Sequence, residues 1–191
     1  MFDGGQAVCR GTFDELAMPG DLSVPVERYM AMARNKTAVL LEAACRVGAI
    51  LGGGDERDAE SLGTFGAHLG IAFQIRDDLL PYLPGPAGTK GKPAESDVRN
   101  QRPILPGLLA HRNADRAGRA AIRHALLNES DPRVPLEQMS FLSERFGAVQ
   151  AACLMADEHL DQALRAIAEV GAGPHCEALS LIAETLVGRS P

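Results

Sequence analysis

Two adjacent carboxylates near the end of a predicted helix are the residues of this chain best suited to chemistry. Asp77 and Asp78 follow Gln74 by three and four positions and Pro81 follows it by seven, a spacing that places all four side chains on one helix face. Adjacent carboxylates repel each other, and the negative C-terminal end of a helix disfavours them further. A divalent cation relieves both penalties, and Mg²⁺ takes one or two carboxylates together with phosphate oxygens and water. The alternative is a solvated acidic helix end.

Cationic and hydroxyl side chains elsewhere in the chain suit a strongly anionic group. Lys36 and Thr37 lie among apolar residues of a predicted helix, where a partly buried lysine needs a phosphate or a carboxylate as its partner. A segment rich in Pro and Gly adds Lys90, Lys92 and Arg102, and its glycines allow the backbone to approach an anion. Two carboxylates for a metal and several cations for an anion together indicate a diphosphate site.

The composition predicts that helices carry these side chains. Ala, Leu, Arg and Glu, which favour helices, are abundant, and only 4% of the residues are aromatic, a class that favours strands. Apolar spacing, with start and stop residues, predicts helices at 26–51, 56–80, 104–127, 135–147, 148–170 and 174–187. The prolines and glycines of residues 81–103 predict a long loop. No repeat or change of composition marks a second domain, so residues 1–191 are predicted to form one all-α domain.

Three glycines share a face with the candidate site on the helix predicted at 56–80. Gly63, Gly66 and Gly70 continue along one stripe onto Gln74 and Asp77. Each glycine costs a helix about 1 kcal/mol relative to alanine, so a compensating gain is expected. The stripe either packs closely against another helix or borders space for a ligand, and the sequence leaves both interpretations open.

Charge and hydropathy exclude several function classes. The 19 basic residues against 25 acidic ones give a net charge of −6, which argues against a nucleic acid partner. No apolar run reaches the roughly 20 residues that span a bilayer, so no transmembrane segment is expected. The first residues lack the basic start and apolar block of a signal peptide, and we therefore expect a cytoplasmic protein.

Short motifs follow one another along the chain in a specific order. They are Tyr29 with Lys36-Thr37-Ala38, then Gly48-Ala49, Phe65-Gly66, Leu69-Gly70, Ala72-Phe73-Gln74-Ile75-Arg76-Asp77-Asp78-Leu79-Leu80, Gly91-Lys92-Pro93, Ser96-Asp97 and Leu105-Pro106. This series resembles the trans-isoprenyl diphosphate synthases, the polyprenyl synthetase family. The resemblance runs over nearly the whole chain, but it corresponds only to the C-terminal part of that family's all-α isoprenoid synthase fold.

The resemblance implies roles for individual residues. Asp77 and Asp78 would belong to the second aspartate-rich motif, which helps to hold the Mg²⁺ ions that bridge an allylic diphosphate. The implied catalytic contacts with that diphosphate are Lys36, Thr37, Gln74 and Lys92, with Arg102 as a further binding residue in the place of a lysine. The implied reaction ionises the allylic diphosphate to a carbocation, adds isopentenyl diphosphate and removes a proton.

The chain also departs from the family pattern. No second Asp-Asp pair occurs, so the first aspartate-rich motif is absent; Pro81 replaces the last Asp of the second motif, and Thr12 replaces a glutamine. Asp157 has acidic neighbours at a similar spacing, but we interpret that segment as a solvated face. We therefore expect a second protein chain that supplies the missing N-terminal half and completes a split synthase. A non-catalytic regulatory subunit of a synthase and a terpene cyclase of the same fold are the alternatives.

Overall fold

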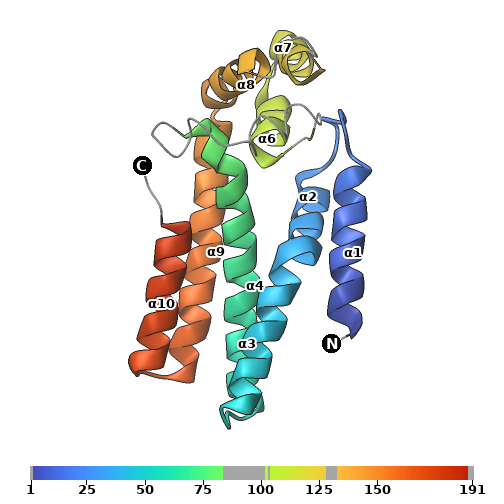
Figure 1. Cartoon of the computed structure of the whole chain (residues 1–191). Coiled ribbons are helices and arrows are strands. Elements are labelled where there is room, and N and C mark those ends of the chain that lie inside the picture. Colours follow the sequence, from blue (N-terminus) through green and yellow to red (C-terminus); the bar gives the residue numbers. More distant parts are fainter. Residues whose placement is uncertain (1, 84–101, 103, 128–132, 189–191) are drawn as a thin grey trace. The chain divides into compact units, whose positions relative to one another are not determined.

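The computed structural model describes residues 2–83, 102, 104–127 and 133–188 (Figure 1). Helices make up the fold, and no strand occurs in these ranges, so the predicted all-α class is confirmed. The elements are α1 (Phe2–Leu16), α2 (Val26–Ala33), η1 (Arg34–Ala38), α3 (Val39–Leu51), α4 (Glu56–Leu79), η2 (Leu80–Tyr82), α6 (Leu105–Asn113), α7 (Arg116–Leu127), α8 (Arg133–Arg145), α9 (Ala148–Val170) and α10 (Pro174–Val187). Within the described ranges, none of these helices combines the length and the apolar character that a bilayer span needs.

The helices group into two compact units. The first comprises Met1–Phe13, Met30–Arg76 and Met155–Ser190, and the second comprises Asp14–Tyr29 and Asp77–Leu154, as far as the structure describes them. In the first unit α9 and α10 lie side by side (Figure 1), and Ile167 and Leu181 line one depression between them. In the second unit α6, α7 and α8 pack against one another. A single domain over the whole chain stays a prediction.

Apolar spacing and turn residues in the sequence predicted the limits of several helices to within one residue. The helices at 148–170 and 174–187 are confirmed as α9 and α10, and the one at 56–80 ends one residue earlier, at Leu79. Pro81 therefore lies in the tight turn η2, outside the helix, which corrects the expectation that it shares a face with Gln74. The helix α1 was not predicted, because its glycines give it a low helix propensity.

The helix expected over residues 104–127 is two helices. Asp115 breaks it, because its Oδ1 accepts the backbone N–H of Gly118 at 2.7 Å and so caps the start of α7. Arg119 then donates to the backbone oxygens of His111 and Arg112 at 3.1 and 3.3 Å, which satisfies carbonyl groups at the end of α6. The break is thus stabilised by polar groups on both sides.

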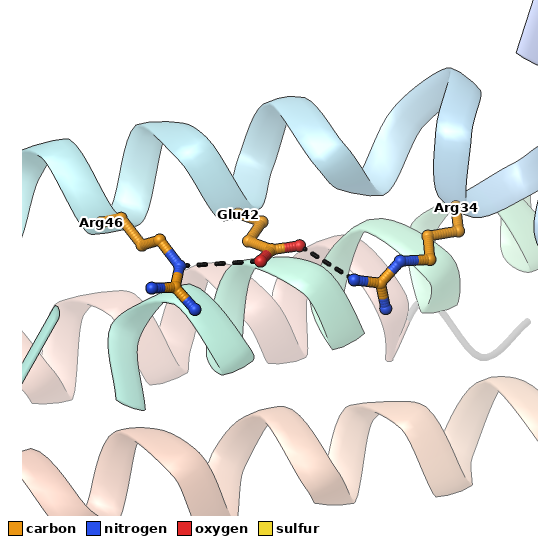
Figure 2. Close-up of polar contacts among 3 residues, drawn as sticks. All are labelled: Arg34, Glu42 and Arg46. Atoms are coloured by element: carbon orange, nitrogen blue, oxygen red, sulfur yellow. Dashed lines mark hydrogen bonds and ion pairs between the residues drawn. The ribbon is translucent and has the colours of Figure 1, made fainter. Parts of the chain in front are cut away.

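A π-helical turn interrupts the helix expected at 26–51. It is η1, which widens the backbone at Arg34–Ala38 between α2 and α3. Glu42 of α3 links this helix to the first residue of the turn, since its carboxylate lies 3.3 Å from Arg34 Nη2. The same carboxylate lies 3.6 Å from Nε of Arg46, one turn further along α3 (Figure 2). The two arginine side chains are 57% and 46% exposed, so these ion pairs add little stability.

Close backbone packing holds the turn instead. A Cβ atom on Gly11 of α1 would lie 2.5 Å from the backbone nitrogen of Lys36, and one on Gly70 of α4 would lie 2.5 Å from Cα of Ala38. Gly66 approaches the carbonyl of Leu41 equally closely. The glycine stripe of α4 is therefore a packing surface for η1 and α3, which decides between the two interpretations left open by the sequence.

His68 of α4 and His159 of α9 face each other in the first unit. Their Nδ1 atoms are 2.9 Å apart, so one ring donates and the other accepts. Burial lowers the pKa of both rings below the ordinary histidine value; Arg34 adds to this shift at His68, and His68 adds to it at His159. Glu158 opposes the shift at His159. The folded structure therefore favours the neutral form of both histidines.

Stability is expected to fall as the pH drops below about 6.5, the ordinary histidine pKa. In the unfolded chain the two histidines take up protons near that pH, whereas their lowered pKa values in the folded chain delay protonation. The stabilisation is therefore complete above pH about 6.5 and is lost as the pH falls through the folded values. Urea unfolding from about pH 8 to about pH 5 measures the effect. If a His68→Gln/His159→Gln variant keeps the same pH profile, the pair is not its source.

Candidate functional site

The π-helical turn places Thr37 against Gln74 in the first unit. Thr37 Oγ1 donates to Gln74 Oε1 at 2.8 Å, and both side chains are partly buried. Lys36 lies on the same turn and is also partly buried. Such turns shift side chains out of the regular helical register and are frequent at functional sites. The structure thus brings together two residues that the sequence singled out 37 positions apart.

Tyr29 holds Asp78 in the second unit. The side chain of Tyr29 is completely buried, and its hydroxyl donates to Asp78 Oδ2 at 2.7 Å. Burial, followed by the charge of Asp78, raises the pKa of Tyr29 well above its ordinary value, so the phenol remains a donor. Asp78 is itself only 8% exposed. Tyr29 belongs to one of the sequence motifs, but its role depends on burial, because a buried tyrosine hydroxyl needs a hydrogen-bond partner.

The two carboxylates are therefore not equivalent. Asp78 is buried and bonded to Tyr29, whereas Asp77 is exposed. No cluster of three or more His, Cys, Asp or Glu side chains that could hold a metal occurs within the described ranges. A metal ion at this position would take a carboxylate oxygen of Asp77 as its protein ligand and its other ligands from phosphate and water. This set of ligands fits Mg²⁺, which commonly keeps several ligands that do not come from the protein.

Arg76 separates Gln74 from the aspartates on α4 and forms an ion pair with Asp157 of α9. The arginine side chain is 11% exposed and that of Asp157 is 53% exposed. A guanidinium this far buried needs an anionic partner, and α9 supplies it. Asp157, Glu158 and Asp161 are exposed, in agreement with the solvated face expected from sequence. The ion pair with Arg76 is an additional contact, which local acidic spacing cannot reveal.

The remaining predicted residues are Lys92 and Arg102. Lys92 lies outside the described residues. Arg102 is described, and its Nη1 lies 3.8 Å from Oε1 of Glu15 in the second unit. Its expected contact with a diphosphate stays a prediction.

Replacing Tyr29 with phenylalanine is expected to lower the free energy of unfolding by about 1–3 kcal/mol, because one oxygen of a buried carboxylate then loses its donor. The ring stays in place, so little packing is lost. Urea unfolding of both proteins at neutral pH measures the difference. A loss below about 0.3 kcal/mol would show that the hydrogen bond between Tyr29 and Asp78 contributes little.

Comparison with known proteins decides the family. A sequence profile of the polyprenyl synthetase family matches residues 4–140, which is more than half of the 191 residues. The chain belongs to the polyprenyl synthetase family. The resemblance carried by the motifs is thereby confirmed.

Two curated members of the polyprenyl synthetase family illustrate the match. The chain is 31% identical over 182 residues to a short chain isoprenyl diphosphate synthase of Methanothermobacter thermautotrophicus. The matched region covers 95% of this chain and 55% of that protein. It is 34% identical over 157 residues to heptaprenyl diphosphate synthase component 2 of Geobacillus stearothermophilus, covering 82% of this chain and 48% of that one. The chain thus spans about half the length of the curated relatives it matches.

A solved structure of the same family supports the fold. Polyprenyl synthase from Caulobacter crescentus CB15, complexed with calcium and isoprenyl diphosphate, superposes with a TM-score of 0.88 at 30% identity. The superposition covers 99% of this chain and 57% of that one. The helices described above therefore form part of the isoprenoid synthase fold.

Proposed function

We propose that this chain is a subunit of a trans-prenyl diphosphate synthase and binds the allylic diphosphate for condensation with isopentenyl diphosphate. The observation that carries the proposal is the sequence of polar groups at the end of α4. Gln74 is fixed there by Thr37, and the exposed Asp77 follows within one helical turn. Family membership is consistent with it. We propose a cytoplasmic setting as part of the same function.

In this proposal the predicted site residues have different tasks. Asp77 would hold Mg²⁺, which when bound supplies positive charge against the departing diphosphate. Lys36 and Lys92 would donate to phosphate oxygens, while Thr37 and Gln74 orient the group through hydrogen bonds. Asp78, bonded to Tyr29, is a positioning residue that keeps this end of α4 in register.

The proposed condensation then breaks one bond and makes another. The bond between the allylic carbon and the diphosphate oxygen breaks, and the electron pair leaves with the oxygen. The carbocation forms a new bond with the double bond of isopentenyl diphosphate, and loss of a proton restores neutrality. The charge that develops on the leaving diphosphate is the charge that these lysines would stabilise.

We further propose that a second chain supplies the missing N-terminal half and the first aspartate-rich motif. The relatives are about twice as long as this chain, and one of them is named as a component 2. An apolar stripe on α3 supports a partner, since Leu40, Val47 and Leu51 are spaced by seven and four residues and are 50%, 42% and 82% exposed. Exposed apolar stripes of this kind mark interaction surfaces.

A non-catalytic regulatory subunit is the second candidate. Two observations favour it: Asp78 is engaged by Tyr29, and Pro81 stands in a tight turn where the family has a third aspartate. Such a subunit would bind a complete synthase and change its stability or its product length.

Native mass spectrometry of the chain, purified gently from its own cells, separates these candidates. A stoichiometric partner that carries an N-terminal half with an aspartate-rich motif is the expected result. The recombined pair should then elongate an allylic diphosphate in the presence of Mg²⁺, and neither chain alone should. A full-length synthase as partner would favour the regulatory subunit, and a chain that elongates or cyclises the substrate alone would overturn the split enzyme.

A further inference from the structure

A basic groove lies over α7, in the second unit. Residues 111–124 hold four arginines and two histidines against one aspartate, although the whole chain has a net charge of −6. The groove has a volume of about 880 Å³, and its polar lining includes Arg116, Arg119, Arg123 and both histidines. We name this set of residues the α7 groove. Neither Asp77 nor any other residue of the candidate site lines it.

Most of the polar groups near the groove have structural tasks. Arg119 donates to the last carbonyls of α6, and Asp115 caps α7, as described above. Arg123 lies near enough to Asp21 to help lower the pKa of that carboxyl, but the main cause of the shift is the hydrogen bond from Ser23. These contacts leave the groove with an excess of positive charge.

Arg116 and Arg123 make no side-chain hydrogen bond of the kind that Arg119 makes, among the residues described. Neither forms an ion pair with a carboxylate among the residues that the structure describes. They are seven residues apart and therefore share one face of α7, with Arg119 between them. Guanidinium groups present forked N–H donors that match phosphate oxygens, so this spacing favours an anion that carries more than one phosphate.

His111 also lines the groove. Its Nε2 atom is buried and has no hydrogen-bond partner within the described part of the chain. Burial lowers the pKa of His111, and the nearby charges of Arg119 and Arg123 lower it further. An anion in the groove would offset the charge of these arginines.

The apolar residues that line the groove indicate that its ligand also has a carbon-rich part. Ala114, Ala120 and Leu127 border the same groove, and Leu127 is 41% exposed. An exposed leucine beside arginines suits a molecule with a phosphorylated end and a carbon-rich remainder. We propose that the α7 groove binds an organic anion with at least two phosphates, through Arg116 and Arg123. This inference is independent of the proposed synthase function.

Calorimetric titration of the full chain with inorganic diphosphate and tripolyphosphate tests the groove. The titrations contain a chelator in place of Mg²⁺ and about 0.15 M salt, which screens weak surface attraction. Arg116→Ala/Arg123→Ala is expected to weaken binding at least about tenfold. The matched control is Arg57→Ala/Arg165→Ala, which removes two arginines from α4 and α9, outside the groove, and should change binding less than about twofold. Circular dichroism confirms that each variant is folded.

Two further measurements distinguish binding in this groove from binding at the site on α4 and identify the source of the phosphate. Lys36→Ala removes a cation assigned to the site on α4. The loss of binding caused by Arg116→Ala/Arg123→Ala should therefore persist in the Lys36→Ala background, since Lys36 does not line the groove. Vesicles of phosphatidylcholine with and without an anionic phospholipid test a lipid headgroup; binding to the anionic vesicles that requires Arg116 and Arg123 would assign the phosphates to lipid. The proposal is overturned if neither probe binds saturably below about 1 mM, if the control loses binding as much as the groove variant, or if the groove substitutions cause no loss of binding in the Lys36→Ala background.

Discussion

Exchange of Asp77 for asparagine is expected to lower the rate of chain elongation by the assembled enzyme by about 10²- to 10³-fold. Asp77 is the exposed carboxylate of the pair on α4, so it is the side chain available to a metal ion. Asparagine has nearly the same size but lacks the charge, so the helix should stay intact while the metal site is lost. Steady-state rates at saturating Mg²⁺, with allylic and isopentenyl diphosphates as substrates, measure the effect.

The control for this exchange is Asp161→Asn on α9, which removes one exposed carboxylate from a helix to which no metal chemistry is assigned. Its rate should stay within about twofold of the original. Asp157 is unsuitable as a control, because its removal breaks the ion pair with Arg76. Equal losses for Asp77→Asn and Asp161→Asn would remove Asp77 from the proposed site.

Asp78→Asn should behave differently from Asp77→Asn. The amide oxygen can still accept the hydroxyl of Tyr29, so the buried hydrogen bond is retained. We therefore expect a smaller loss of rate than at Asp77. A larger loss at Asp78 would show that the buried carboxylate, and not the exposed one, carries the chemistry.

Substitution of Gly70 by alanine is expected to destabilise the chain by about 1–3 kcal/mol, the usual cost of overpacking a tight contact. The added Cβ would lie 2.5 Å from Cα of Ala38 and 2.9 Å from its Cβ, so η1 would have to move away from α4. The same movement would lengthen the hydrogen bond between Thr37 and Gln74. Urea unfolding gives the stability, and the diphosphate affinity should fall in parallel.

Gly48→Ala is the matched control, and it should have the opposite sign. Gly48 lies on an exposed part of α3, and nothing lies within 4 Å of the position that its Cβ would take. Alanine in an open helix position gains about 0.5–1 kcal/mol over glycine. If Gly70→Ala gains stability as Gly48→Ala does, helix propensity outweighs close packing, and the packing interpretation of the glycine stripe is wrong.

Much of the fold could be predicted from sequence because its signals are local. The apolar spacing and the Gly-Ala-Gly-Pro junction at 171–174 located α9 and α10, and the turn residues near Leu51 located the start of α4. The residue types at 74, 77 and 78 likewise indicated a metal and an anion through their side-chain chemistry alone. By contrast, α1 escaped prediction because its glycines give it a low helix propensity, while its close contact, Gly11 against Lys36, joins residues 25 positions apart.

The sequence by itself determined the helical class, most helix limits, the family resemblance and the residues suited to a diphosphate. Only the tertiary structure decided which of those residues meet. It placed a π-helical turn at Lys36 and Thr37, paired Tyr29 with Asp78 across 49 positions, and gave Arg76 a partner 81 positions away. The physical reason is that helix formation depends on neighbours within one or two turns, whereas a buried polar group takes whichever partner the packing of helices brings to it.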